Sequence, residues 1–145
     1  MTTAAEIESY LVEYQEALSA FDAQRSVAQW GAPGTMVTDA FVGSMATTAE
    51  MAKGLEQSYP LYQALGLASV DHTVLEHVDL TDRITRLHVR WHFYDVEGNL
   101  LTDCDYEYLL RRDDDGQLRA YVAVAIDEME QIAKLAATKG IQLPS

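Results

Sequence analysis

The spacing of apolar and polar residues follows one period in the first half of the chain and another in the second. Up to about residue 65, apolar residues recur every three or four positions, which predicts amphipathic helices over about 5–20, from Asp22 to about 30, and from Thr47 to about 65. From Ser69 onward, apolar and polar residues alternate, as in strands with one buried face. Helices followed by a run of strands predict the α+β class.

Local signals place the ends of the third helix. Thr47 and Glu50 match a Thr-x-x-Glu capping box, in which each side chain bonds the backbone N–H of the other residue. Pro60 lacks a backbone N–H and predicts a kink or a break, and Gly66 is suited to a left-handed helix end. Two short strands are expected before this helix, at 35–38 and 41–45.

The second half predicts an antiparallel meander. Its strands are expected at 69–80, 84–94, 100–112 and 118–126. Their connections are short and rich in Asp, Gly and Asn, as hairpins require. A last helix is expected from Asp127 to Gly140, with an apolar side formed by Met129, Ile132, Ala133 and Ala136. We expect one domain over 1–145, with a curved antiparallel sheet wrapped round the N-terminal helices over about 5–127 and a C-terminal helix over about 128–139.

Two strands near position 100 carry polar and apolar rows on opposite faces. The apolar row consists of Leu87, Val89, Trp91 and Phe93 with Cys104, Tyr106 and Tyr108; the polar row consists of Arg86, His88, Arg90 and His92 with Asp103, Asp105 and Glu107. If Asp105 faces a pocket, the chain is equipped for proton chemistry. If it faces water, it pairs with arginine and histidine side chains across the hairpin. The second alternative is favoured, because three buried acids in one row would be costly.

Charge and cysteine content exclude several classes of protein. The 145 residues are 48% hydrophobic and 23% charged, with a net charge of -13, so binding to nucleic acid or to anionic membranes is disfavoured. No segment has the roughly 20 apolar residues of a membrane span, and the first residues lack a basic, apolar leader, so we expect a cytoplasmic protein. Cys104 is the only cysteine, which rules out an intrachain disulfide and a cysteine-based metal cluster.

The histidines do not form a convincing metal site. His88 and His92 lie about 13 Å apart along one strand, too far to share an ion. His72 and His77, five residues apart, are predicted to lie on opposite faces of their strand. The chain also lacks a phosphate loop and a dinucleotide fingerprint, so we expect neither a metal nor a cofactor.

The order of elements over about 5–127 resembles the nuclear transport factor 2-like superfamily, also described as the SnoaL-like or cystatin-like α+β barrel. Within it, short motifs are similar to those of ketosteroid isomerases: Tyr14-x-x-Ala17-Leu18, Val37-Thr38-Asp39 and Cys104-Asp105-Tyr106. This resemblance implies that Asp39 abstracts and returns a proton while Tyr14 and Asp105 donate hydrogen bonds to a developing oxyanion. It also implies a homodimer formed through the sheet.

These roles are physically coherent, but each residue has a structural alternative. Proton removal next to a carbonyl needs an ionised carboxylate and preorganised donors, and Asp105 donates only if burial keeps it protonated. The alternatives are a packing role for Tyr14, a turn-forming role for Asp39 and a solvated ion pair for Asp105.

The apolar inventory predicts a pocket for a small apolar ligand with a polar end. Its expected lining, besides Tyr14, is Trp30, Met51, Leu55, Tyr59, Tyr62, Trp91 and Tyr121. Three functions follow: an isomerase, cyclase or dehydratase with Asp39 as base, a non-catalytic ligand-binding or dimerisation module, or an accessory subunit of a larger enzyme. The enzyme hypothesis requires the Tyr14 hydroxyl and the Asp39 carboxyl to line one cavity.

Overall fold

A computed structural model describes residues 1–143. The elements within this range are α1 (Ala4–Ser19), α2 (Ala23–Val27), β1 (Trp30–Val37), β2 (Val42–Met45), α3 (Thr48–Ala64), β3 (Ser69–Asp79), β4 (Ile84–Tyr94), β5 (Leu100–Arg112), β6 (Leu118–Ala125) and α4 (Glu128–Lys139). This α+β architecture confirms the predicted class and order. In the described part of the chain, no helix is long and apolar enough to cross a membrane.

The sheet is mixed and open, which corrects the expectation of a purely antiparallel sheet. Its strand order is β2-β1-β6-β5-β4-β3, so β2 and β3 are its two edges. Strands β3 to β6 form the predicted antiparallel meander. Strand β1 pairs with β6 in parallel, and β2 pairs with β1 antiparallel. The pattern within each strand carries no information about this pairing, because α3 and four strands separate β1 from β6 along the chain.

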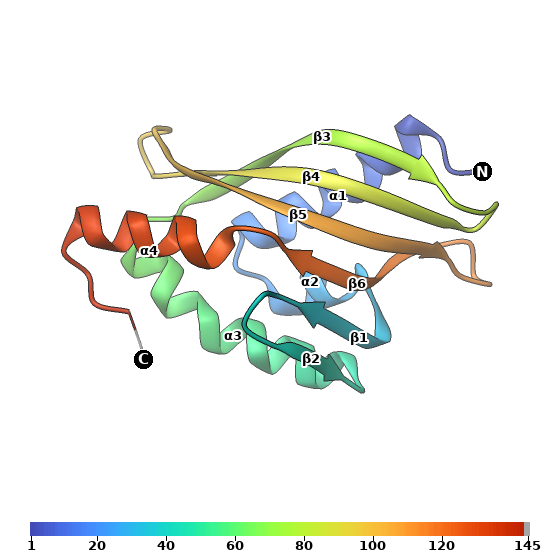
Figure 1. Cartoon of the computed structure of the whole chain (residues 1–145), viewed down its shortest axis with the longest axis horizontal. Helices are drawn as coiled ribbons and strands as arrows, with labels where there is room; N and C mark the ends of the chain where they lie inside the picture. Colours follow the sequence, from blue (N-terminus) through green and yellow to red (C-terminus); the bar gives the residue numbers. More distant parts are fainter. Residues whose placement is uncertain (144–145) are drawn as a thin grey trace.

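The helices cover one face of the sheet and enclose the core. Figure 1 shows α1 and α2 behind the strands, while α3 and α4 lie toward the end at which the chain terminates. Leu11 of α1 is fully buried in one cluster with Leu87 and Val89 of β4 and Leu110 of β5. Burying each such side chain contributes about 1.5–3 kcal/mol, so this cluster stabilises the packing of α1 against the sheet.

Capping side chains start the helices largely as predicted. Asp22 accepts a hydrogen bond from the Arg25 N–H (3.2 Å), and Thr47 accepts one from the Glu50 N–H (3.2 Å). A complete capping box forms instead at α1, where Thr3 and Glu6 bond each other's backbone N–H groups at 3.1 Å. Each bond satisfies a backbone donor that the first helical turn leaves unpaired.

Two details of the helices differ from expectation. The second helix ends at Val27, and Trp30 is the first residue of β1 instead of part of that helix. Helix α3 continues through Pro60 without a break. Pro60 is exposed, so water can bond the carbonyl that its missing N–H leaves unpaired. Gly66 follows this helix with a φ of 94°, the left-handed conformation expected there.

The predicted cross-strand pairs form in part on the outer face, with Asp103 and Asp105 as the acidic partners. His92 Nδ1 lies 2.6 Å from Asp103 Oδ1, in direct register across β4 and β5. Arg86 differs, because it pairs with Glu76 of β3 and not with a residue of β5. The side chains on the other face of these two strands are buried, among them Leu87, Val89, Trp91 and Cys104.

A bulge in β3 changes the faces of two histidines. The register shifts between Val74 and Glu76, so that His72 lies opposite Trp91 and His77 lies opposite Leu87. Trp91 and Leu87 both face the core, and so the two histidines share a face, contrary to the prediction from counting residues. Across residues 1–143, no group of three or more His, Cys, Asp or Glu side chains is arranged to hold a metal ion.

Candidate functional site

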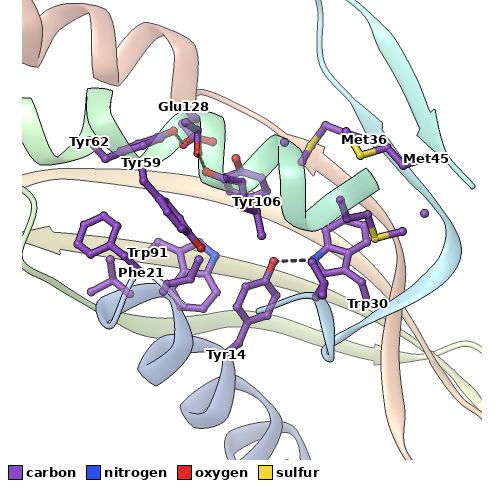
Figure 2. Close-up of a pocket in the computed structure, with 18 of the residues that line it drawn as sticks. Tyr14, Phe21, Trp30, Met36, Met45, Tyr59, Tyr62, Trp91, Tyr106 and Glu128 are labelled. Carbon is purple, nitrogen blue, oxygen red and sulfur yellow. Dashed lines mark hydrogen bonds between the residues drawn. The ribbon is translucent and has the colours of Figure 1, made fainter. Parts of the chain in front are cut away.

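A cavity of about 500 Å³ lies between the helices and the inner face of the sheet. Its wall is largely aromatic and aliphatic, with contributions from every helix and from most strands (Figure 2). The lining residues are Tyr14, Leu18, Phe21, Val27, Trp30, Gly34, Met36, Phe41, Gly43, Met45, Met51, Gly54, Leu55, Ser58, Tyr59, Tyr62, Leu67, Val70, Trp91, Phe93, Tyr106, Tyr108 and Glu128.

The segment from β1 to β2 borders the mouth of this cavity. Phe41 and Met45 both line the cavity, yet they are 52% and 39% exposed. Large apolar side chains that face both solvent and the cavity mark the point at which an apolar molecule can enter.

Tyr14 holds a polar group in the apolar wall. The Trp30 indole Nε1–H donates to the Tyr14 hydroxyl oxygen at 2.6 Å, and this hydroxyl points toward the interior in Figure 2. Burial is the main cause that raises the pKa of Tyr14 to about 12, so the hydroxyl keeps its proton at neutral pH. No residue among 1–143 accepts that proton, which leaves it available to an oxygen of a bound molecule.

Glu128 brings a carboxyl group to the same cavity. It lies in the first turn of α4, and the Tyr62 hydroxyl of α3 donates to its Oε1 atom. Burial raises the pKa of Glu128, and the Tyr62 bond opposes that rise without cancelling it. The negative charge of Glu128 also raises the pKa of Tyr14, so the charge of this carboxyl acts on the Tyr14 hydroxyl.

Sequence reasoning missed Glu128, although a signal was present. Glu128, Ile132 and Leu135 are spaced at i, i+4 and i+7, so they share one side of α4. Ile132, Leu135 and Ala136 are buried, whereas Met129 and Ala133 of the predicted apolar side are exposed, Met129 by 60%. The buried side is therefore rotated from Met129 toward Glu128, which takes the carboxyl into the cavity wall.

Tyr59 and Ser26 place two further hydroxyls near the cavity. Both hydroxyl oxygens are buried and have no hydrogen bond of ordinary geometry with residues 1–143. Burial raises the pKa of Tyr59, and the nearby Ser26 hydroxyl partly offsets that rise. The Phe21 ring packs edge-on against the Tyr59 ring, with the ring centroids 5.2 Å apart. Phe21 follows the end of α1 and has a left-handed backbone conformation, with a φ of 52°.

The predicted lining residues are in the cavity wall with one exception. The residues found there are Trp30, Met51, Leu55, Tyr59, Tyr62 and Trp91. Tyr121 lies elsewhere: its hydroxyl donates to the Asp113 carboxylate at 2.7 Å, and its ring fills the space beside Gly31, where a Cβ would lie 2.2 Å from a ring carbon. The Tyr121 hydroxyl is therefore bonded to Asp113 in the β5–β6 connection and does not line the cavity.

Asp39 lies outside the cavity wall. It is exposed in the turn between β1 and β2, while Phe41 and Gly43 of the same segment reach the cavity. The Thr38 hydroxyl builds this turn by accepting the backbone N–H groups of Ala40 and Phe41, both at 3.1 Å. The arrangement that the enzyme hypothesis required, with Asp39 and Tyr14 in one cavity, is therefore not found.

Asp105 lies on the outer face of the sheet. Its carboxylate accepts bonds from Arg90 Nε at 2.8 Å and Nη2 at 3.1 Å, and His88 Nε2 lies at 3.0 Å. Arg90 is the main cause that lowers the pKa of Asp105, so the group is ionised at neutral pH. An ionised carboxylate on this face does not donate to an oxyanion in the cavity.

Comparison with known proteins identifies the fold and the family. The sequence matches the family described as NTF2-like protein (DUF6841) over residues 5–128. An NTF-2 like protein of unknown function from Shewanella oneidensis MR-1 has a similar structure, with 15% identity and a TM-score of 0.69, over 85% of this chain and 98% of that one. No curated protein matches in sequence.

Two further structures have the same likeness. A ketosteroid isomerase-like protein from Erwinia carotovora atroseptica SCRI1043 shares 15% identity at a TM-score of 0.61, over 84% of this chain and 93% of that one. A domain of unknown function with a cystatin-like fold from Nostoc punctiforme PCC 73102 shares 13% identity at a TM-score of 0.69, over 97% of this chain and 90% of that one. These identities show likeness of fold alone, whereas the sequence match spans most of the chain, which therefore belongs to the NTF2-like family DUF6841.

Proposed function

We propose that this protein binds a small, largely apolar molecule with one polar end. The observation that carries the proposal is the cavity of about 500 Å³ with its aromatic wall. Ligand sites commonly have volumes of about 300–1,000 Å³ and combine an apolar wall with a few fixed polar groups. The exposed apolar side chains of Phe41 and Met45 at the mouth support access from solvent.

Tyr14 supplies the contact for the polar end. Because its oxygen accepts the Trp30 N–H, its rotation is restricted and its proton is directed elsewhere. A ligand hydroxyl or carbonyl oxygen satisfies this buried donor, and a hydrogen bond of this kind contributes about 0.5–1.5 kcal/mol.

The proposal is tested by calorimetric titration with 1-adamantanol, a compact apolar alcohol. We expect binding to the wild type and its loss in Leu55→Trp, because the larger ring fills the cavity. Leu75→Trp is the matched control, since Leu75 is exposed on β3 and lies outside the cavity wall. Equal binding by the two variants, or no binding by the wild type, would contradict the proposal.

A second candidate function is proton transfer on a ketone. It is favoured by one observation, the presence of Tyr14 and Glu128 in one cavity. The ionised Glu128 carboxylate takes a proton from the carbon next to the carbonyl, Tyr14 donates to the enolate oxygen, and Glu128 returns the proton to carbon. Glu128 replaces Asp39 as the base in this scheme.

Deuterium exchange into cyclohexanone, followed by NMR, tests this candidate. We expect Glu128→Gln to slow the exchange that the wild type catalyses and Asp39→Asn to leave it unchanged. The opposite result would restore Asp39 as the base, and exchange no faster than in buffer would remove the candidate. The homodimer formed through the sheet stays a prediction, for which sedimentation velocity is the measurement.

A further inference from the structure

We propose that the preferred ligand of the cavity is a lipophilic amine in its protonated form, with Glu128 as its counter-ion. The proposal rests on the proposed binding function and names the chemical class of the ligand. It starts from a carboxyl group in the cavity wall that has no partner of opposite charge among residues 1–143.

Glu128 has no cationic neighbour in the described chain. The cavity wall formed by residues 1–143 contains no lysine, arginine or histidine, and the ion pairs of this range do not include Glu128. Tyr62 donates to Oε1, while Oε2 has no hydrogen-bond partner within the same range. A buried carboxylate is stable when it is paired and hydrogen-bonded, and otherwise tends to take up a proton. A bound ammonium group supplies the missing charge and N–H donors for Oε2.

The surrounding rings suit a cation with an apolar body. Trp30, Trp91, Tyr59 and Tyr106 line the cavity together with Glu128, and Figure 2 shows them around the same space. The negative face of an aromatic ring attracts a cation, an interaction that strengthens where water is excluded. An anionic ligand would instead be repelled by the Glu128 carboxylate and by the negative faces of these rings.

The net charge of the whole chain also favours a cationic ligand. A net charge of -13 produces a negative potential around the protein, which attracts cations and repels anions during approach. On the outer face of the sheet, Asp105 already forms an ion pair with Arg90 and contacts His88. Glu128 differs, because its carboxyl lines a cavity large enough for a ligand and has no cationic partner among residues 1–143.

The proposal predicts how affinity depends on pH. The titratable groups that interact with or adjoin Glu128 are Tyr62 on α3, Tyr14 on α1, Cys104 on β5 and Asp127, the N-cap residue of α4. Burial raises the pKa values of Tyr62, Tyr14 and Cys104, so all three stay neutral between pH 5 and about pH 8. Asp127 lies next to Glu128 on α4, and its Oδ1 accepts the Asp105 backbone N–H at 2.8 Å. Burial raises the Glu128 pKa above its ordinary value, so this carboxyl carries more negative charge at pH 8 than at pH 5, while an aliphatic amine stays protonated up to about pH 10.

The experiment compares three ligands that share one apolar body. 1-Adamantylamine is a cation, 1-adamantanol is neutral and 1-adamantanecarboxylate is an anion, and each is titrated calorimetrically at pH 5 and pH 8. We expect the amine to bind at least about tenfold more tightly than the alcohol at pH 8, with a smaller ratio at pH 5 and the weakest binding for the carboxylate.

Variants assign the preference to Glu128. Glu128→Gln keeps the size of the side chain and should reduce the ratio of amine to alcohol affinity to about one at both pH values. Leu75→Trp changes an exposed residue of β3 outside the cavity wall, and so should retain the preference for the amine. If Glu128→Gln does not fold, the pH dependence of the wild type decides the question.

The outcomes separate this proposal from the proposed function. Binding of the alcohol without preference for the amine would overturn the amine proposal and leave the binding function standing. A preference for the amine that persists in Glu128→Gln would also overturn it. Absence of binding by all three ligands to the wild type would overturn both proposals.

Discussion

The inner and outer faces of the sheet hold their carboxyl groups in opposite ways. On the outer face, Asp105 accepts two bonds from Arg90 and lies beside His88, and its pKa is lowered mainly by Arg90. In the cavity on the inner side, the Tyr62 hydroxyl is the only hydrogen-bond partner of the Glu128 carboxyl among residues 1–143, and burial raises the pKa of Glu128. The difference shows that surroundings and not residue type decide whether an acid serves the fold or is available to a ligand.

The largest expected effect separates the apolar inner row from the polar outer row. Leu87 of β4 is fully buried, so Leu87→Ala should lower the free energy of unfolding by about 2–5 kcal/mol through lost burial and the cavity left behind. Its neighbour Arg86 faces outward and pairs with Glu76 at the surface, so Arg86→Ala should lower it by less than about 1 kcal/mol. Urea denaturation measures both values, and equal losses would contradict the assignment of the two faces.

The next effect tests the outer carboxylate. Asp105→Asn should lower the free energy of unfolding by about 1–2 kcal/mol at pH 7, because Arg90 and His88 lose a charged partner. The folded-state pKa of Asp105 lies below its ordinary value of 3.8, so its contribution is present above that pH and is lost as pH falls through the lower, folded value. Urea titrations at pH 7 and pH 3 should therefore show a smaller difference between variant and wild type at pH 3.

The contribution of Glu128 to the free energy of unfolding should depend on pH in the opposite direction. The folded-state pKa of Glu128 lies above its ordinary value of 4.5, so the folded state binds more protons, and stability falls as pH rises from the ordinary value through the folded value. Glu128→Gln removes this penalty and keeps an acceptor for Tyr62, so it should be more stable than the wild type at pH 8 by on the order of 1 kcal/mol. The free energy of unfolding of Glu128→Gln is compared with that of the wild type at pH 5 and at pH 8. A smaller advantage of the variant at pH 8 than at pH 5 would contradict this expectation.

The smallest effect is expected at Asp39. Its side chain is exposed, and the hydroxyl of Thr38 builds the surrounding turn. Asp39→Asn should change the free energy of unfolding by less than about 0.5 kcal/mol and leave the affinity for 1-adamantanol unchanged. Weaker binding would show that the turn between β1 and β2 brings Asp39 to the cavity mouth when a ligand enters.

Some features of the site could be predicted because they depend on periodicity. Alternation in β4 and β5 predicted that Trp91 and Cys104 face inward and that Arg90 and Asp105 face outward, and the structure confirms both faces. The spacing along α1 predicted the buried position of Tyr14. Such positions follow from geometry within one element, which neighbouring residues are sufficient to specify.

Other features could not be predicted because they depend on small shifts between elements. One extra residue in β3 brings His72 and His77 to the same face, and periodicity does not reveal where a bulge lies. A rotation of α4 by one position exchanges Met129 for Glu128 on its buried side. Successive residues on a helix differ by about 100° in direction, so this shift decides which side chain faces the cavity.

By itself, the sequence determined the α+β class, the positions of most helices and strands, and the two faces of the hairpin that carries Trp91 and Asp105, because period and turn residues are local properties. Tertiary structure alone decided the parallel pairing of β1 with β6, the exclusion of Asp39 and Tyr121 from the cavity, and the inclusion of Glu128. These depend on how distant elements pack, since a cavity exists only where surfaces from separate parts of the chain enclose it.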